Sequence, residues 1–207
     1  MTLIQRIQTN LEKPLPGKTA QDKMSHAIRR HATLIPKNAR TACVLGLLYP
    51  KDGEWHIILI ERQSSHPDDK HGGQISFPGG MQESTDSSLE DTALRETFEE
   101  VGIPVEEIKL LGPTTSLYIP VSNFQVFPFL AYLEKTPVFH PQPSEVRSIL
   151  EVPLSHFSNK ENLKMTDMKV SKNMTLKNVP YYDVEGHILW GATAMMIREM
   201  LEVMEVV

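Results

Sequence analysis

The stretch of sequence that decides the fold covers residues 80–103 and reads GMQESTDSSLEDTALRETFEEVGI. Three of its carboxylates stand at positions i, i+3 and i+4, at Glu96, Glu99 and Glu100. On a helix this spacing gathers the three side chains on one patch, next to Arg95. The opposite side carries an apolar ridge, formed by Leu94, Phe98 and Val101. We expect an amphipathic helix that buries this ridge and turns its acidic side toward a cleft or solvent.

The ends of this helix are predicted by its capping residues. Ser87 followed by Glu90 is typical of a capping box at the start of a helix. Gly102 with Pro104 is typical of a helix stop. The sequence therefore predicts a helix from about Ser88 to Val101.

The segment before the helix gives its acidic side a functional interpretation. On an arbitrary surface helix, such a side is most often simply solvated. Here residues 77–80 read FPGG, which can end a strand and bring bare backbone close to a ligand. A glycine turn, an arginine and three carboxylates suit divalent cations that carry a phosphorylated substrate. Oxygen-only ligands of this kind favour Mg²⁺ or Mn²⁺.

These residues resemble the Nudix box, whose general form is G-x5-E-x7-R-E-U-x-E-E-x-G-U, with U an aliphatic residue. The second half of the box is matched by Arg95, Glu96, Glu99, Glu100, Gly102 and Ile103. Thr97 takes the place of the first aliphatic residue. Fourteen residues separate Gly80 from Arg95 where the general pattern has thirteen. The early glutamate position therefore falls on Asp86 or Ser87.

A longer signature is similar to that of the coenzyme A diphosphatase branch of Nudix enzymes. Residues 71–80 read HGGQISFPGG and follow LIER at residues 59–62. The likeness covers most of residues 40–193 and is loosest between Arg62 and His71. It implies an α/β/α sandwich with a mixed β-sheet. It also implies metal-dependent hydrolysis of coenzyme A or its derivatives to 4′-phosphopantetheine and adenosine 3′,5′-bisphosphate.

The resemblance implies roles for individual residues. The metal ligands are Glu96, Glu99 and Glu100, with Glu99 and Glu100 also counted as catalytic and Arg95 as the group that orients them. The substrate-binding residues are Arg62, Lys70, His71, Gln74, Phe77, Gly79 and Gly80. Lys70 stands where an arginine for a phosphate is expected, and His71 has a structural hydrogen-bonding role as its alternative. Glu145 is the candidate general base, with an ordinary acidic residue at a helix start as its alternative.

Composition limits the partners of the chain. Its 207 residues, 40% of them hydrophobic, suit a single domain over residues 1–207, with residues 1–36 as an N-terminal helical appendage. A net charge of −5 provides no broad positive field for nucleic acid. No apolar run has membrane-spanning length, and we expect a cytoplasmic protein. Cys43, the one cysteine, lies in an apolar run and is expected to be an inert thiol in a buried strand.

Periodicity and turn residues predict the other elements. We expect helices over residues 2–11, 22–31 and 192–204, and hairpins that pair 41–49 with 55–61 and 179–184 with 187–190. Residues 144–146 are expected to start a short turn or helix. The last helix carries four methionines at Met195, Met196, Met200 and Met204, which indicate core packing or a homodimer contact.

Two rival functions stay open at this stage. The first keeps the hydrolase fold and changes the substrate to another nucleoside diphosphate derivative, such as ADP-ribose or NADH, or to a nucleoside triphosphate. The second is a catalytically silent domain that binds a nucleotide. The complete set of three glutamates favours an enzyme, because a binding domain has no need to keep it.

Overall fold

The computed structural model describes residues 1–26, 34–63, 73–171 and 174–207. Its main sheet has eight strands in the order β3-β2-β1-β7-β5, with β4 paired to β1, β6 to β7 and β8 to β2. The pairing of β1 with β7 is parallel, whereas β2 and β4 lie antiparallel to β1, so the sheet is mixed. These strands are β1 (Arg40–Lys51), β2 (Glu54–Arg62), β3 (Ile75–Ser76), β4 (Gly79–Met81), β5 (Lys109–Pro113), β6 (Leu117–Ile119), β7 (Phe124–Tyr132) and β8 (Val146–Pro153).

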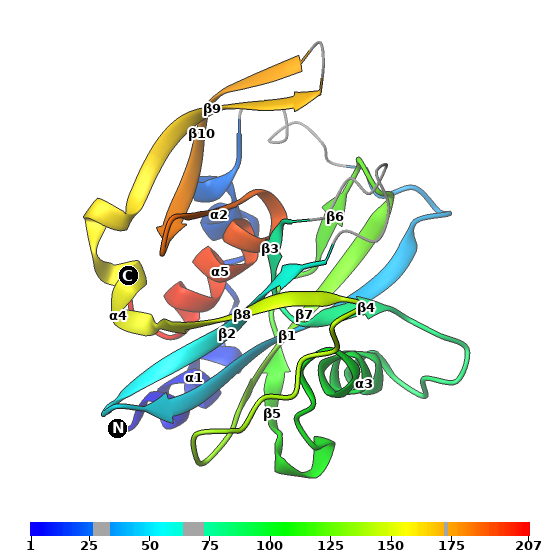
Figure 1. The fold of residues 1–207 in the computed structure, drawn as a ribbon, viewed down its shortest axis with the longest axis vertical. Helices are drawn as coiled ribbons and strands as arrows, with labels where there is room; N and C mark the ends of the chain where they lie inside the picture. The colour runs from blue at the N-terminus through cyan, green and yellow to red at the C-terminus, as the bar shows by residue number, and fades with distance from the viewer. Residues whose placement is uncertain (27–33, 64–72, 172–173) are drawn as a thin grey trace.

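Helices cover both faces of this sheet, and Figure 1 shows α3 and α5 on opposite sides of the central strands. The helices are α1 (Leu3–Leu11), α2 (Gly17–Gln21), α3 (Leu89–Val101), α4 (Leu154–Ser158) and α5 (Gly191–Val203), with 3-10 turns η1 (Asp22–Met24), η3 (Val105–Glu107) and η4 (Lys160–Asn162). Alternate residues of β1 point to the two sides: Leu45 and Leu47 pack with α3, and Leu48 packs with α5. The predicted α/β/α sandwich is confirmed.

A corner between β3 and β4 positions the site. β1 and β2 form the predicted hairpin, with Asp52 and Gly53 at positive φ in its turn. Farther along, the two strands separate, and β3 pairs with β2 while β4 pairs with β1. The FPGG segment therefore lies between two central strands, where its backbone is fixed from both sides.

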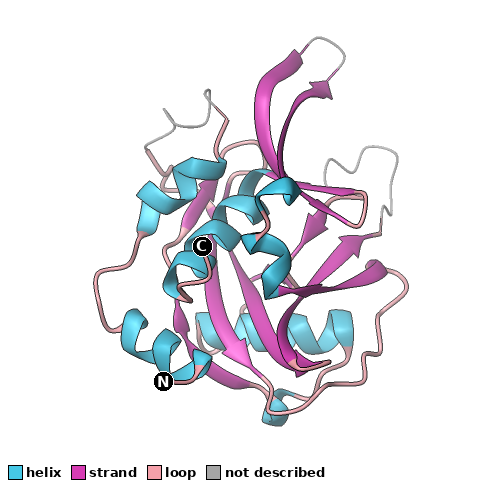
Figure 2. Ribbon diagram, turned by 90° about the vertical axis from the view of Figure 1, so that its left-hand side faces the viewer, coloured by secondary structure: helices cyan, strands magenta, loops and turns pink. Residues whose placement is uncertain are grey.

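A second sheet consists of β9 (Leu163–Ser171), β10 (Met174–Val184) and β11 (His187–Trp190) in the order β11-β10-β9. The predicted hairpin around Glu185 and Gly186 is confirmed, with both residues at positive φ. Figures 1 and 2 both show the β9–β10 pair rising above the rest of the protein. The four methionines at the end of the chain are buried in a hydrophobic core together with residues of the main sheet, so the core alternative is confirmed.

One local prediction is confirmed in its first alternative, because residues 143–145 form a turn, which strand β8 follows. Another prediction needs correction. The N-terminal helix α1 is confirmed, whereas the polar helix predicted over residues 22–31 is wrong in its described part. Helical structure begins earlier, at Gly17, and ends at Met24. Its first part is held by the buried Glu199 of α5, which accepts hydrogen bonds from the Gly17 N–H and the Gln21 side chain. Residues 27–33 lie outside the described part of the chain.

Candidate active site

Helix α3 starts and ends close to its predicted limits, but with a different cap. Ser88, not Ser87, is the N-cap, and its hydroxyl accepts a hydrogen bond from the Asp91 N–H at 3.0 Å. The Ser87 hydroxyl instead donates to the Asp91 carboxylate. Gly102 takes a left-handed conformation with φ of 71° and ends the helix as predicted.

The face of α3 that packs on the sheet also differs from the prediction. The buried residues are Thr92, Ala93, Thr97, Glu100 and Val101. Phe98 is 51% exposed, so its assignment to the buried ridge is wrong. The short side chains Ala93 and Thr97 let the helix lie close to β1, and the Thr97 hydroxyl is satisfied by donating to the Ala93 carbonyl at 2.7 Å. This rotation carries a carboxylate, Glu100, into the packed side of the helix.

Glu100 is bonded to the corner between β3 and β4, residues 77–80, which we call the glycine corner. Its Oε2 accepts a hydrogen bond from the Gly79 N–H at 2.8 Å, and its Oε1 lies 3.3 Å from an Arg62 guanidinium nitrogen. Burial raises the pKa of Glu100 to about 7, against the lowering influence of the Gly79 N–H and Arg62. A buried carboxylate of this kind gains most from a nearby cation.

Both glycines of the corner are required by close contacts. Gly79 has φ of 146°, and a Cβ there would lie 2.2 Å from the Cys43 carbonyl oxygen. A Cβ on Gly80 would lie 2.4 Å from Oε2 of Glu96. The bare backbone of the corner therefore makes room for the Glu96 carboxylate.

Arg95 holds together the other carboxylates of the site. Its guanidinium donates to both oxygens of Asp86 at 2.8 and 2.9 Å, and to the Met81 carbonyl at 3.2 Å. One nitrogen, Nη1, also lies 3.0 Å from Oε1 of Glu96 and 2.9 Å from Oε2 of Glu99. A planar guanidinium with several bonded partners is strongly oriented.

Asp86 lies next to the glutamates of α3 through its ion pair with Arg95, and it is one of the two residues on which the early glutamate position of the sequence pattern could fall. It is paired with Arg95 and accepts hydrogen bonds from the Thr92 hydroxyl and the Glu83 N–H. The Arg95 hydrogen bond is the main reason that the pKa of Asp86 lies well below its usual range. The acidic residue itself was the signal in the sequence. The extra residue between Gly80 and Arg95 left its alignment with the early glutamate of the pattern uncertain by one position.

Glu145 lies near Glu96 and Glu100. Its negative charge contributes to raising the pKa values of both Glu96 and Glu100, for which burial is the largest cause. The turn that carries it is fixed by backbone hydrogen bonds from Gln142 to the Glu100 carbonyl and from Gln63 to the Glu145 carbonyl. The fold thus brings Glu145 to α3 from a distant part of the sequence.

The donor set suits a hard divalent cation. Within the described ranges, no three Asp, Glu, His or Cys side chains already converge as a metal cluster. Arg95 and Gly79 occupy some of the glutamate oxygens. Oε2 of Glu96 and Oε1 of Glu99 accept no hydrogen bond from the described residues. Oxygen-only donors with free lone pairs, next to a buried carboxylate of raised pKa, fit Mg²⁺ or Mn²⁺ after side-chain adjustment.

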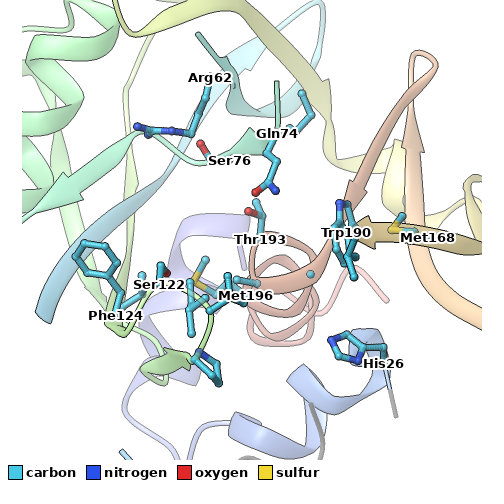
Figure 3. Close-up of a pocket in the computed structure, with 18 of the residues that line it drawn as sticks. His26, Arg62, Gln74, Ser76, Ser122, Phe124, Met168, Trp190, Thr193 and Met196 are labelled. Carbon is cyan, nitrogen blue, oxygen red and sulfur yellow. The ribbon is translucent and has the colours of Figure 1, made fainter. Parts of the chain in front are cut away.

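A cavity of about 1480 Å³ lies on the other side of the glycine corner. Its lining includes five of the predicted substrate-binding residues: Arg62, Gln74, Phe77, Gly79 and Gly80. Lys70 and His71 lie outside the described residues. Figure 3 shows Arg62 and Ser76 at one side of the cavity and Trp190 with Met168 at another, with the Gln74 side chain pointing toward Thr193. The predicted glutamates are not among its described lining residues.

Comparison with known proteins gives the family. Residues 38–174 match the NUDIX domain. A Photorhabdus laumondii protein named uncharacterized Nudix hydrolase NudL is 32% identical over 196 residues, which cover 95% of this chain and 94% of that protein. A protein of the same name from Pectobacterium atrosepticum is 35% identical over 143 residues, with 69% and 72% covered.

Solved structures agree on the fold. A Nudix hydrolase from M. smegmatis, RenU, superposes with a TM-score of 0.56 at 17% identity, covering 82% of this chain and 88% of that one. The NUDIX domain of Shewanella oneidensis NrtR, complexed with ADP ribose, gives a TM-score of 0.52 at 18% identity, with 86% and 98% covered. At these identities the likeness concerns the fold alone.

The chain therefore belongs to the Nudix hydrolase family. Members of this family hydrolyse pyrophosphate bonds and generally use divalent metal ions such as Mg²⁺. The predicted family and enzyme class are confirmed. Among the described helices, none is both long and apolar enough to cross a membrane.

Proposed function

We propose that this protein hydrolyses the diphosphate of coenzyme A or its derivatives, releasing 4′-phosphopantetheine and adenosine 3′,5′-bisphosphate. The observation that carries the proposal is the cavity beside the glycine corner. It has guanidinium groups at Arg40 and Arg62 and an apolar wall at Met168, Trp190 and Met196. Coenzyme A likewise has a charged part and a weakly polar part, because a nucleotide and a long pantetheine arm flank its diphosphate.

The acidic helix supplies the chemistry in this proposal. Glu96, Glu99 and Glu100 would hold Mg²⁺ or Mn²⁺, which when bound neutralises charge on the diphosphate and acidifies the attacking water. Arg95 keeps Glu96 and Glu99 turned toward each other through its ion pairs of 3.0 and 2.9 Å. The Gly79 N–H fixes the Glu100 carboxylate.

Glu145 is the proposed general base. A carboxylate outside the ligand set keeps more of its basicity than one that binds a metal, so it can accept the proton of the attacking water. Its electrostatic influence on Glu96 and Glu100 supports a position on their side of the site. As an exposed residue it can move toward the substrate.

The substrate contacts are proposed on two grounds. Arg62, Gln74, Phe77, Gly79 and Gly80 line the cavity. The loop before them would add Lys70 and His71, as the family resemblance implies.

Some properties of the whole protein are also proposed. They are a single domain over residues 1–207 with residues 1–36 as an appendage, a cytoplasmic location, and a homodimer as the alternative to a monomer. The buried, unpaired Cys43 supports a reducing compartment. Light scattering on the purified protein decides between monomer and dimer.

A substrate panel tests the proposal. We expect coenzyme A to be cleaved with a higher kcat/KM than ADP-ribose or NADH in the presence of Mg²⁺. EDTA should abolish turnover, and Mg²⁺ or Mn²⁺ should restore it. A preference for ADP-ribose or NADH of about tenfold, worth about 1.4 kcal/mol, would assign the protein to the rival substrate class. Binding without any turnover would indicate a silent nucleotide-binding domain.

A further inference from the structure

Arg40, at the start of β1, differs from the other arginines of the described chain. Five of them form ion pairs with carboxylates: Arg6, Arg62, Arg95, Arg147 and Arg198. Within the same described ranges, Arg40 alone has no carboxylate partner. A guanidinium without an opposite charge, placed in the wall of a ligand cavity, is available to an anion.

The Arg40 side chain is nevertheless held in place. Its guanidinium carbon lies 4.0 Å from the centroid of the Phe124 ring, in cation–π contact. One guanidinium nitrogen donates to the Ser122 carbonyl at 2.9 Å. The Arg40 N–H donates to the Asn123 carbonyl at 2.9 Å. These contacts orient the planar group and leave most of its five donors for a ligand.

Strand geometry places Arg40 well away from the predicted chemistry. Arg40, Ala42 and Val44 alternate along β1 and all line the cavity, and Val44 is paired with Gly79. Four residues of strand separate Arg40 from the glycine corner by roughly 13 Å. Arg62, the other arginine among the described lining residues, is paired with Glu100 beside that corner. Among the described residues, the cavity thus has cationic side chains at Arg40, Arg62 and, beside Met168, Lys169, and of the two arginines Arg62 is the one that adjoins the acidic helix.

The two partners of the Arg40 side chain, Phe124 and Ser122, lie on one side of the cavity in Figure 3. In that view Phe124 and Ser122 lie across the cavity from Trp190 and Met168. An anion at Arg40 is therefore separated both from the acidic helix and from the part of the apolar wall formed by Trp190 and Met168. A phosphate monoester suits such a guanidinium, because the two groups can form parallel, charge-assisted hydrogen bonds.

We propose that Arg40 binds a phosphate monoester on the nucleoside part of the substrate, separate from the diphosphate that is cleaved. Arg40 would then be a specificity determinant that favours nucleoside diphosphates with an additional ribose phosphate over those without it. This inference rests on the proposed function and specifies its substrate class. The competing role is a purely structural one, in which Arg40 only fastens β1 to β7 through Phe124 and Ser122.

Equilibrium binding tests the inference independently of turnover. The probes are adenosine 3′,5′-bisphosphate and adenosine 5′-monophosphate, measured by titration calorimetry on the wild type and on Arg40→Gln. We expect the wild type to bind the bisphosphate at least about tenfold more tightly, as a charge-assisted hydrogen bond permits, and Arg40→Gln to lose this difference. Equal affinities in the wild type, no binding of either probe, or an unchanged difference in Arg40→Gln would overturn the inference.

Kinetics separates this inference from the proposed function. With coenzyme A and dephospho-coenzyme A, Arg40→Gln should raise KM for the first by about tenfold and leave the second within about twofold. Arg147→Gln is the matched control, since this arginine is exposed and does not line the cavity. Equal losses on both substrates together with a lower Tm would support the structural role. If the wild type cleaves neither compound but still prefers the bisphosphate in binding, the proposed function fails and the inference about Arg40 stands.

Discussion

The two sides of the glycine corner are built in different ways. On one side, Arg95 draws its partners Asp86, Glu96 and Glu99 from fewer than ten residues away along the chain. On the other side, the cavity wall combines residues as far apart as Arg40 and Trp190. A local motif can carry the chemistry of a whole family, whereas the residues that select a substrate come together only through the tertiary fold.

The largest expected effect comes from the acidic helix itself. We expect Glu99→Gln and Glu100→Gln to lower kcat by more than about 100-fold, because even the outer partners of metal ligands typically contribute about 10–100-fold. Glu90→Gln is the control on the same helix, since Glu90 lies in its first turn. Steady-state kinetics with Mg²⁺ measures the three variants. Similar losses in all three would mean that the changes act through helix stability.

Glu145 tests whether a residue from outside the local motif shares in its chemistry. We expect Glu145→Gln to lower kcat by about 100-fold or more, as general bases do, with Tm and KM nearly unchanged. The substitution keeps the size of the side chain, and the hydrogen bonds that fix this turn come from the backbone. Full kcat across the pH range would make Glu145 an ordinary turn residue and place the base among Glu83, Glu151 or the glutamates of α3.

Asp86 tests how far the orientation of Arg95 matters. We expect Asp86→Asn to lower kcat by about 10–100-fold, as loss of an orienting partner does. Folding lowers the pKa of Asp86. The ionised Asp86 therefore stabilises the fold at pH values above its pKa in the unfolded chain, about 3.9, and this stabilisation is lost as the pH falls below that value. Thermal melts from pH 6 to pH 3 should therefore decline less steeply in Asp86→Asn than in the wild type. Parallel melting curves of the two proteins would show that pairing with Arg95 does not lower the pKa of Asp86.

The two glycines of the corner separate stability from activity. Gly79→Ala should strongly lower Tm, because its Cβ would strike the Cys43 backbone and φ of 146° strains any side chain. Gly80→Ala should leave Tm closer to the wild type and lower kcat by about tenfold, because its Cβ meets only the movable end of Glu96. Melting curves and kcat of both variants check this. An equally large loss of Tm in both would contradict the distinction.

Local signals explain what could be predicted from the sequence. Gly102 ended α3 where expected, and the two hairpins formed where the sequence predicted them, with Asp52 and Gly186 at positive φ in their turns. Each of these depends on the conformational preference of a residue within its own turn. The glycine corner was likewise predictable, because FPGG can end a strand and bring bare backbone close to a ligand.

The remaining features depend on contacts between distant segments. The apolar spacing of α3 assigned Phe98 to the core, but the fit of Ala93 and Thr97 against the sheet rotated the helix and buried Glu100. The pairing of Asp86 with Arg95 was concealed by the extra residue in the loop. Arg40 gave no signal in the sequence, because its importance comes from a cavity to which β1, β7 and the second sheet all contribute.

The most direct test compares one variant from each side of the corner on two substrates. We predict that Glu99→Gln lowers kcat/KM for coenzyme A and ADP-ribose by the same factor, so that their ratio is unchanged. Trp190→Ala, checked for an intact melting transition, should lower kcat/KM for coenzyme A by about tenfold more than for ADP-ribose, since burying an aromatic side chain against a ligand contributes about 1.5 kcal/mol or more. A changed ratio in Glu99→Gln, or an unchanged ratio in Trp190→Ala, would contradict the assignment of chemistry to the helix and selection to the cavity.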